Sequence, residues 1–175
     1  MYSFTNGSRA VGFKIGADSL FNPVLLSLLL NRRVRKIVLH RHELLHVYTS
    51  ILIAQQTHIW SETDKGKSRN QQPSVEVDPA KLVRFVRRRR LFYRIVDAIL
   101  SATRQPHMKL SYEEFTSDPA AVKRTLGFLG VDPDQPLSAG TVKQNSPRLA
   151  DRITNYTQLC EALRGTRMEW LVSDN

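Results

Sequence analysis

A short apolar run that leads directly into a helical pattern limits the fold of this chain most. Residues 37–40 read Ile-Val-Leu-His, and a polar, basic connector at 31–36 precedes them. Compact apolar runs of this kind are typical of strands buried in a parallel sheet. From Glu43 to Trp60 apolar residues recur with helical spacing, at Leu44, Val47, Tyr48, Ile51, Leu52 and Ile59. The sequence therefore predicts a strand at 37–40 and a helix at 43–60.

Capping signals predict the other helices. Asp78-Pro79 combines an N-cap residue with proline at the first helical position, and the helix is expected to run to about 103. Asp118-Pro119 repeats this signature before a helix that ends near Gly130. A further helix is expected at about 20–30, capped by Asp18 or Ser19, and a last one at 150–171.

Two more segments predict strands: 11–15, which is short, partly β-branched and followed by Gly16, and 108–112, another short run, Met-Lys-Leu-Ser-Tyr. Strands that alternate with helices predict an α/β fold with a mainly parallel sheet flanked by helices. A chain of 175 residues is expected to form one domain, 1–175.

Charge and cysteine content narrow the function. The chain has 26 Lys and Arg against 16 Asp and Glu, and residues 1–90 hold 16 of the basic and 6 of the acidic residues. A basic half predicts an anionic ligand. Cys160 is the one cysteine, so an intramolecular disulfide is excluded, and no Cys/His spacing suits zinc. The longest aliphatic stretch, 23–30, is too short to span a bilayer, so a soluble, cytoplasmic protein is expected.

The candidate site is the junction after the strand at 37–40, because ligands of parallel sheets bind beyond the carboxyl ends of the strands. Arg41 would lie there, and its guanidinium matches phosphate oxygens. Ser50 lies with His46 and Thr57 on the polar face of the next helix. This polar face is directed toward either solvent or a ligand. In the alternative interpretation Arg41 pairs with an acidic residue, Glu43 or Glu62, and Ser50 is merely solvated.

Several segments, in order, resemble sulfotransferases that use 3′-phosphoadenosine 5′-phosphosulfate (PAPS). The chain from His40 to Leu44, with Ser50, is similar to their 3′-phosphate-binding segment, and 54–60 (Ala-Gln-Gln-Thr-His-Ile-Trp) is similar to the bacterial carbohydrate type that acts on trehalose or nodulation factors. The other segments are Val11-Gly12-Phe13-Lys14, Leu110 to Phe115, Asp118-Pro119, Phe128 to Val131, and Asp151-Arg152-Ile153 with Asn155-Tyr156.

This resemblance implies a fold, a co-substrate and a ligand set. The fold would be a P-loop-NTPase-like parallel sheet, incomplete at its N-terminus. Arg41, Ser50 and, in the late loop, Lys143 would bind PAPS, and the acceptor would be a hydroxyl of a carbohydrate or glycolipid. No metal is expected. The catalytic residues stay open, although His40, His42, His46 and His58 are possible general bases.

The family's Gly/Ser-rich phosphosulfate loop has no counterpart within these residues. We therefore expect a truncated sulfotransferase, corresponding to the C-terminal portion of the family domain, that binds nucleotide but does not transfer sulfate. Two alternatives remain: a catalytically inactive remnant that binds a nucleotide or anion, and a basic nucleic-acid-binding protein. The second is disfavoured because no nucleic-acid motif is present.

Overall fold

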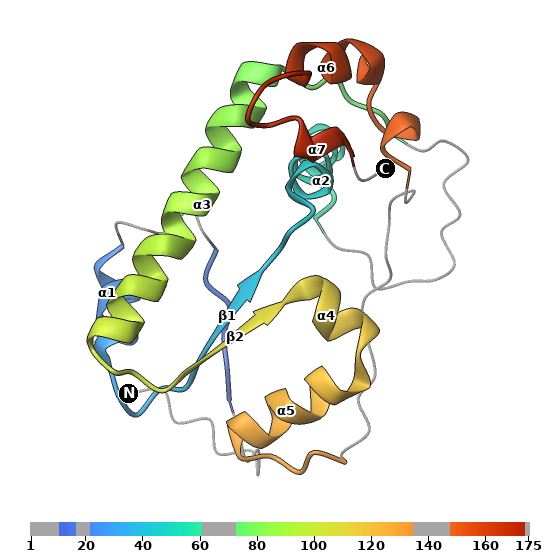
Figure 1. Cartoon of the computed structure of the whole chain (residues 1–175). Coiled ribbons are helices and arrows are strands. Elements are labelled where there is room, and N and C mark those ends of the chain that lie inside the picture. Colours follow the sequence, from blue (N-terminus) through green and yellow to red (C-terminus); the bar gives the residue numbers. More distant parts are fainter. Residues whose placement is uncertain (1–10, 17–21, 61–72, 135–147, 174–175) are drawn as a thin grey trace. The chain divides into compact units, whose positions relative to one another are not determined.

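The helices and strands of the computed structural model form two compact units (Figure 1). The structure describes residues 11–16, 22–60, 73–134 and 148–173. The sheet unit comprises Met1–His42 and Arg89–Pro136, and the helical unit comprises Glu43–Arg88 and Leu137–Asn175. The mixture of helices with a parallel strand pair confirms the coarse α/β class.

The sheet unit is built on two parallel strands. Strand β1 (Lys36–His40) pairs with β2 (His107–Ser111), and the register places Val38 opposite Lys109 and His40 opposite Ser111. The helices of this unit are α1 (Pro23–Leu30), the part of α3 (Pro79–Ala102) from Arg89 onward, α4 (Tyr112–Ser117) and α5 (Pro119–Leu129).

One face of the strand pair packs against α1 and α3. Apolar side chains from these three elements form the core of the sheet unit: Leu25, Leu29, Val38, Phe92, Val96 and Leu100. On the other face, Thr125 of α5 contacts Met108 of β2 through its hydroxyl, 3.8 Å from the sulfur. Ile37 and Leu39 of β1 stay partly exposed on that face.

The helical unit consists of α2 (Leu44–Thr57), α3 up to Arg88, a 3-10 turn η2 (Leu149–Asp151), α6 (Tyr156–Leu163) and α7 (Trp170–Ser173). Its core is separate from that of the sheet unit, and its most buried members are Leu45, Val77, Leu82, Val86, Leu149, Ile153, Leu159 and Leu163. The unit also contains a parallel bridge between Val75 and Ile153. Just after it, the Asn155 side chain bonds both the N–H and the C=O of Val77, each at 3.0 Å.

Both Asp-Pro helix starts are confirmed. Asp78 accepts hydrogen bonds from the N–H groups of Ala80 and Lys81, at 2.8 and 3.1 Å, and Asp118 accepts one from Ala120 at 2.8 Å. Gly130 ends α5 in the left-handed region at φ 74°, as a helix-terminating glycine does. The predicted helices at 43–60 and 79–103 are confirmed within three residues at each end.

The prediction of a strand at 11–15 was wrong. These residues are irregular, with Val11 61% and Phe13 67% exposed, and Ile15 is the one that packs against the core of the sheet unit. A run this short, with Gly12 in its middle, packs little side chain to support pairing. The strand expected at 108–112 ends at Ser111, because the Ser111 hydroxyl caps α4 and Tyr112 is already helical.

The boundaries of two helices also differ from those expected. Helix α1 begins at Pro23 rather than about 20, because the Asn22 side chain caps it by accepting from the Val24 N–H at 2.9 Å. The expected last helix at 150–171 is divided into η2, α6 and α7. Asn155 is held by Val77, and Gly165 adopts φ 69° after α6. Within the described residues, no helix is long and apolar enough to cross a membrane.

Candidate anion-binding residues

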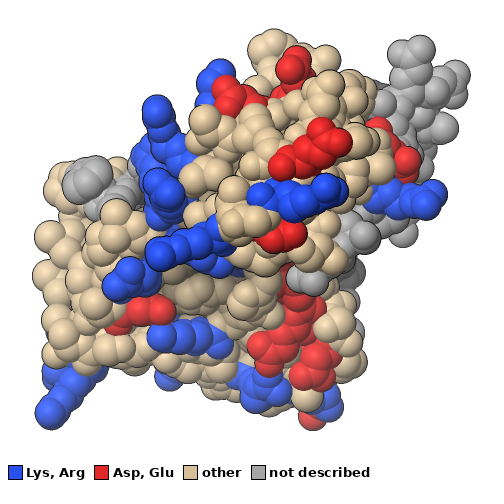
Figure 2. All heavy atoms as spheres, turned by 45° about the horizontal axis from the view of Figure 1, so that its top comes forward, with Lys and Arg blue, Asp and Glu red and all other residues tan. Residues whose placement is uncertain are grey.

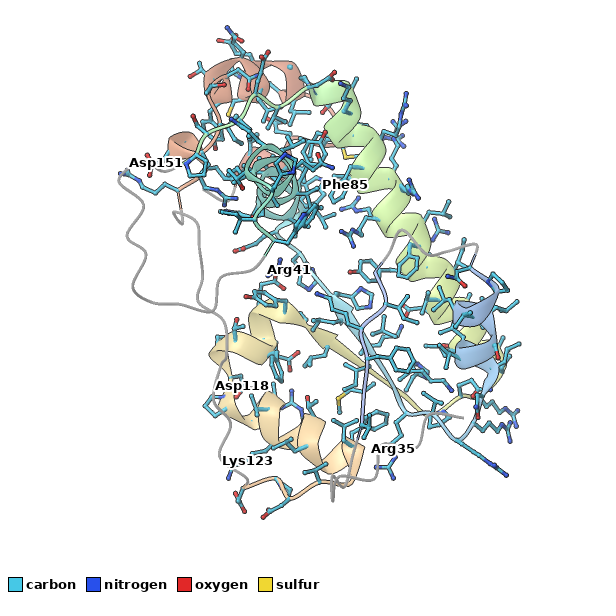
Figure 3. All side chains as sticks on the ribbon, turned by 180° about the vertical axis from the view of Figure 1, so that it is seen from behind. Arg35, Arg41, Phe85, Asp118, Lys123 and Asp151 are labelled. Carbon is cyan, nitrogen blue, oxygen red and sulfur yellow. The ribbon has the colours of Figure 1, made fainter. Side chains whose placement is uncertain are left out.

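Parallel pairing brings the residues that follow β1 and β2 to the same edge of the sheet unit. Arg41 follows β1, and Tyr112 follows Ser111 at the end of β2. The Arg41 guanidinium lies over the Tyr112 ring, with its Cζ 3.7 Å from the ring centroid. Figure 3 shows Arg41 where β1 ends. The predicted position of Arg41 beyond the carboxyl end of a parallel strand is therefore confirmed.

The chain on either side of Arg41 is fixed by side chains from neighbouring elements. The Tyr93 hydroxyl donates to the Leu39 carbonyl at 3.0 Å, and the His42 N–H donates to Glu113 Oε1 at 3.2 Å. The second oxygen of Glu113 is buried and has no hydrogen-bond partner among the described residues. Tyr93 and Glu113 thus hold the turn that carries Arg41 from both sides.

Within the described part of the chain, the N–H groups of the Arg41 guanidinium have no hydrogen-bond acceptor. Among the described residues no carboxylate, Glu43 included, forms an ion pair with it, and Glu62 lies outside the described residues. Stacking uses the face of a guanidinium and leaves its N–H groups pointing outward in the plane. Burial raises the pKa of the nearby Tyr93 phenol, and the positive charges of Arg89 and Arg41 oppose that rise. The phenol therefore stays neutral at pH 7.

His40, the last residue of β1, packs against a neighbouring aromatic ring at this edge of the sheet. Its ring lies against Tyr93 with 4.3 Å between centroids, and its Nε2 is buried without a partner among the described residues. Burial lowers the pKa of His40, while the Asp97 carboxylate opposes the shift. A neutral imidazole next to Arg41 meets one requirement for a general base.

Ser50 lies in the helical unit, and its hydroxyl is hydrogen-bonded to other residues rather than to solvent only. Its hydroxyl donates to the His46 carbonyl at 2.8 Å and accepts a hydrogen bond from Nη2 of Arg152, also at 2.8 Å. Nη1 of Arg152 is 3.3 Å from Nδ1 of His46. The polar face of α2 therefore meets a buried arginine, whereas Thr57 bonds back to the Ile53 carbonyl.

Arg152 is the site residue that reasoning from the sequence missed. It is 3% exposed, and burial lowers its pKa. From the sequence, Arg152 was named only as one residue of the segment 151–156 that resembles sulfotransferases. The signal was its place between Leu149 and Ile153, which are both buried in the structure. A cation three residues after one inward-facing apolar side chain and next to another can itself face inward.

The other predicted residues have separate outcomes. Arg41 and Ser50 belong to different units, so their binding to one anion stays a prediction. Lys143 lies outside the described residues. His42 uses its backbone N–H on Glu113, and His58 ends α2 at φ 57°. Among the described residues, no group of three or more His, Cys, Asp or Glu could hold a metal ion.

The basic residues of the connector are partly used inside the sheet unit. Lys36 is buried, and its Nζ donates to the Asn31 carbonyl at 2.6 Å and to Gln105 Oε1 at 2.8 Å. Arg35 donates to the Phe128 carbonyl at 2.6 Å and is labelled in Figure 3. The face drawn in Figure 2 carries acidic as well as basic side chains. On that face the basic side chains are interspersed with acidic ones.

Comparison of the chain with protein-family models, with curated proteins and with solved structures gave no match.

Proposed function

We propose that this chain is a sulfotransferase-like protein that binds PAPS through a phosphate at Arg41. In this proposal the sheet unit is part of a P-loop-NTPase-like sheet, and the complete site transfers the sulfuryl group to a hydroxyl of a carbohydrate or glycolipid. The position of Arg41 supports the proposal most directly. Its guanidinium stacks on Tyr112 beyond the carboxyl ends of β1 and β2 and has no recorded acidic partner among the described residues.

The geometry at Arg41 suits a phosphate for two reasons. The contact with the Tyr112 ring limits the movement of the guanidinium, so less side-chain freedom is lost when two phosphate oxygens bind its N–H groups. The strand ends also present the position at which parallel α/β sheets bind ligands. The turn is held by Glu113 and Tyr93 before any ligand arrives.

Binding and transfer are expected to separate in these 175 residues. Sulfuryl transfer needs donors around the moving group, as phosphoryl transfer does, and the loss of one such donor typically costs about 10²–10³ in rate. The Gly/Ser-rich loop that supplies these donors in the family has no counterpart in the sequence. The chain alone is therefore expected to bind adenosine 3′,5′-bisphosphate about as well as PAPS, without transferring sulfate. A catalytically inactive nucleotide-binding remnant would behave in the same way.

The test is calorimetric titration of adenosine 3′,5′-bisphosphate into the chain and its Arg41→Ala variant. We expect Arg41→Ala to weaken binding roughly 10- to 100-fold, the scale of a charge-assisted hydrogen bond. Arg41→Lys keeps the charge but not the planar fork and should recover only part of the affinity. Arg33→Ala is the matched control, because Arg33 is exposed and its replacement by alanine removes the same charge elsewhere in the sheet unit.

Two results would count against the proposal. If Arg33→Ala weakens binding as much as Arg41→Ala, the nucleotide is attracted by net charge alone. If no nucleotide binds, the resemblance does not extend to function. A radiolabelled sulfate-transfer assay with sugar and glycolipid acceptors tests the second half, and clear transfer by this chain would mean that some other segment replaces the missing loop.

A further inference from the structure

We infer that Arg152 is the centre of an oxyanion-binding site in the helical unit, shared with Ser50, that takes a group of the phosphate or sulfate class. The contacts behind this inference all lie within that unit. It rests on the proposed function only for the identity of a nucleotide that would carry the group.

Burial without a counter-charge is the first reason. Arg152 is 3% exposed, and a guanidinium keeps its charge in a protein. Its side-chain partners are the Ser50 hydroxyl and Nδ1 of His46, and neither of them is a carboxylate. No carboxylate among the described residues forms an ion pair with it, and its neighbour Asp151 is exposed (Figure 3). Buried charges are normally paired, and Arg152 has no anionic partner among the residues that the structure describes.

The unused donors are the second reason. A guanidinium has five N–H groups, and one bond to Ser50 and one to His46 leave three without a recorded acceptor among the described residues. Nε is one of the three, and it is buried with no hydrogen-bond partner. The N–H on Nε and one N–H on an Nη share an edge of the guanidinium, which is the fork that binds two oxygens of a phosphate or sulfate.

The surrounding chain fixes this arginine before a ligand binds. The Arg152 N–H donates to the Leu149 carbonyl at 3.0 Å, and its carbonyl accepts from the Val75 N–H at 2.9 Å. Nη1 of Arg152 approaches Nδ1 of His46, so that nitrogen is the acceptor and the imidazole proton is assigned to Nε2. The Ser50 hydroxyl now donates to the His46 carbonyl, and it can turn that hydrogen toward an anion while still accepting from Arg152.

The experiment measures the thermal unfolding midpoint of the full chain while inorganic phosphate or sulfate replaces chloride at constant ionic strength. Specific binding should raise the midpoint by about 3–6 °C for every tenfold increase in phosphate above the dissociation constant. Phosphate and sulfate also stabilise proteins in general by exclusion from their surfaces. Arg167→Lys measures that general effect, because Arg167 is an exposed arginine of the same unit.

Two variants make the test specific to Arg152. Arg152→Lys keeps a charge but removes the fork, and it should respond to phosphate by the general effect alone. Ser50→Asp places a carboxylate next to Nη2 of Arg152 and supplies the missing anion from within. This variant should unfold at a higher temperature than the wild type in chloride, and phosphate should add nothing specific.

The results separate this inference from the proposed function. Two results would overturn the site. In the first, phosphate raises the unfolding midpoint of the wild type no more than salt exclusion predicts. In the second, phosphate raises the midpoint of Arg152→Lys as much as those of Arg167→Lys and the wild type. If Arg152→Lys does not fold, the Ser50→Asp comparison decides alone. Nucleotide binding that needs Arg41 but not Arg152 would leave only the proposed function standing. A phosphate response that needs Arg152, without any nucleotide binding, would leave only this site.

Discussion

His40 illustrates how the environment of one residue sets its charge. Its ring lies against Tyr93, its Nε2 is buried without a recorded partner among the described residues, and burial lowers its pKa below the ordinary value of 6.5. In the unfolded chain the same imidazole would take up a proton near that ordinary value. The folded state therefore binds fewer protons than the unfolded state at mildly acidic pH.

From this difference we predict how stability depends on pH. The stabilisation from His40 is complete above pH 6.5 and is lost as the pH falls below that value toward its lowered folded pKa. His40→Gln should therefore give a shallower fall of the urea midpoint between pH 6.5 and 5. His58→Asn is the control, since His58 is exposed and asparagine tolerates its left-handed backbone. Equal slopes in the wild type and His40→Gln would contradict the prediction.

Reasoning from the sequence located single residues unevenly. Arg41 was predictable because it directly follows an apolar strand, and strand ends have a known place in α/β proteins. The environment of Ser50 was not predictable, because its partner Arg152 is 102 positions away in the sequence. No local pattern reports a contact of that separation.

At the scale of elements, local chemistry decided most of what was predictable. Asp78 and Asp118 cap α3 and α5 through bonds that span two or three residues, so their signal is complete within the sequence window. The Asn22-Pro23 start of α1 uses the same chemistry. The division of the last helix depends instead on Asn155, whose side chain bonds Val77 far away in the sequence.

The cap of α3 gives a prediction at this scale. Asp78 satisfies two N–H groups at the start of the longest helix, so Asp78→Ala should lower the free energy of unfolding by about 1 kcal/mol. Asp78→Asn keeps an acceptor oxygen and should lose much less. Urea unfolding followed by circular dichroism measures both. An equal loss in the two variants would point to the charge on Asp78, which also lies 4.0 Å from Lys81, rather than to the cap.

At the scale of the molecule, one helix belongs to both compact units. The sequence predicted α3 almost to the residue but gave no sign that the chain divides within it, after Arg88. The reason is that its apolar side chains continue with helical spacing on both sides of the Arg87–Arg90 run, while their packing partners differ. Leu82 and Val86 belong to the core of the helical unit, and Phe92 and Val96 to that of the sheet unit. Which core a helical position joins depends on distant parts of the chain.

Two leucines test whether these cores are independent. Leu100 and Leu159 are both 0% exposed, one in the core of the sheet unit and the other in that of the helical unit. Leucine-to-alanine changes at such positions typically cost about 2–5 kcal/mol. Hydrogen exchange should therefore accelerate in β1, β2 and α1 for Leu100→Ala, and in α2 and α6 for Leu159→Ala. Each variant should leave exchange in the other unit close to that of the wild type, because local opening draws on the contacts of its own core. If both variants accelerate hydrogen exchange equally across β1, β2, α2 and α6, the two clusters form one cooperative core. The chain would then have to unfold as a single domain.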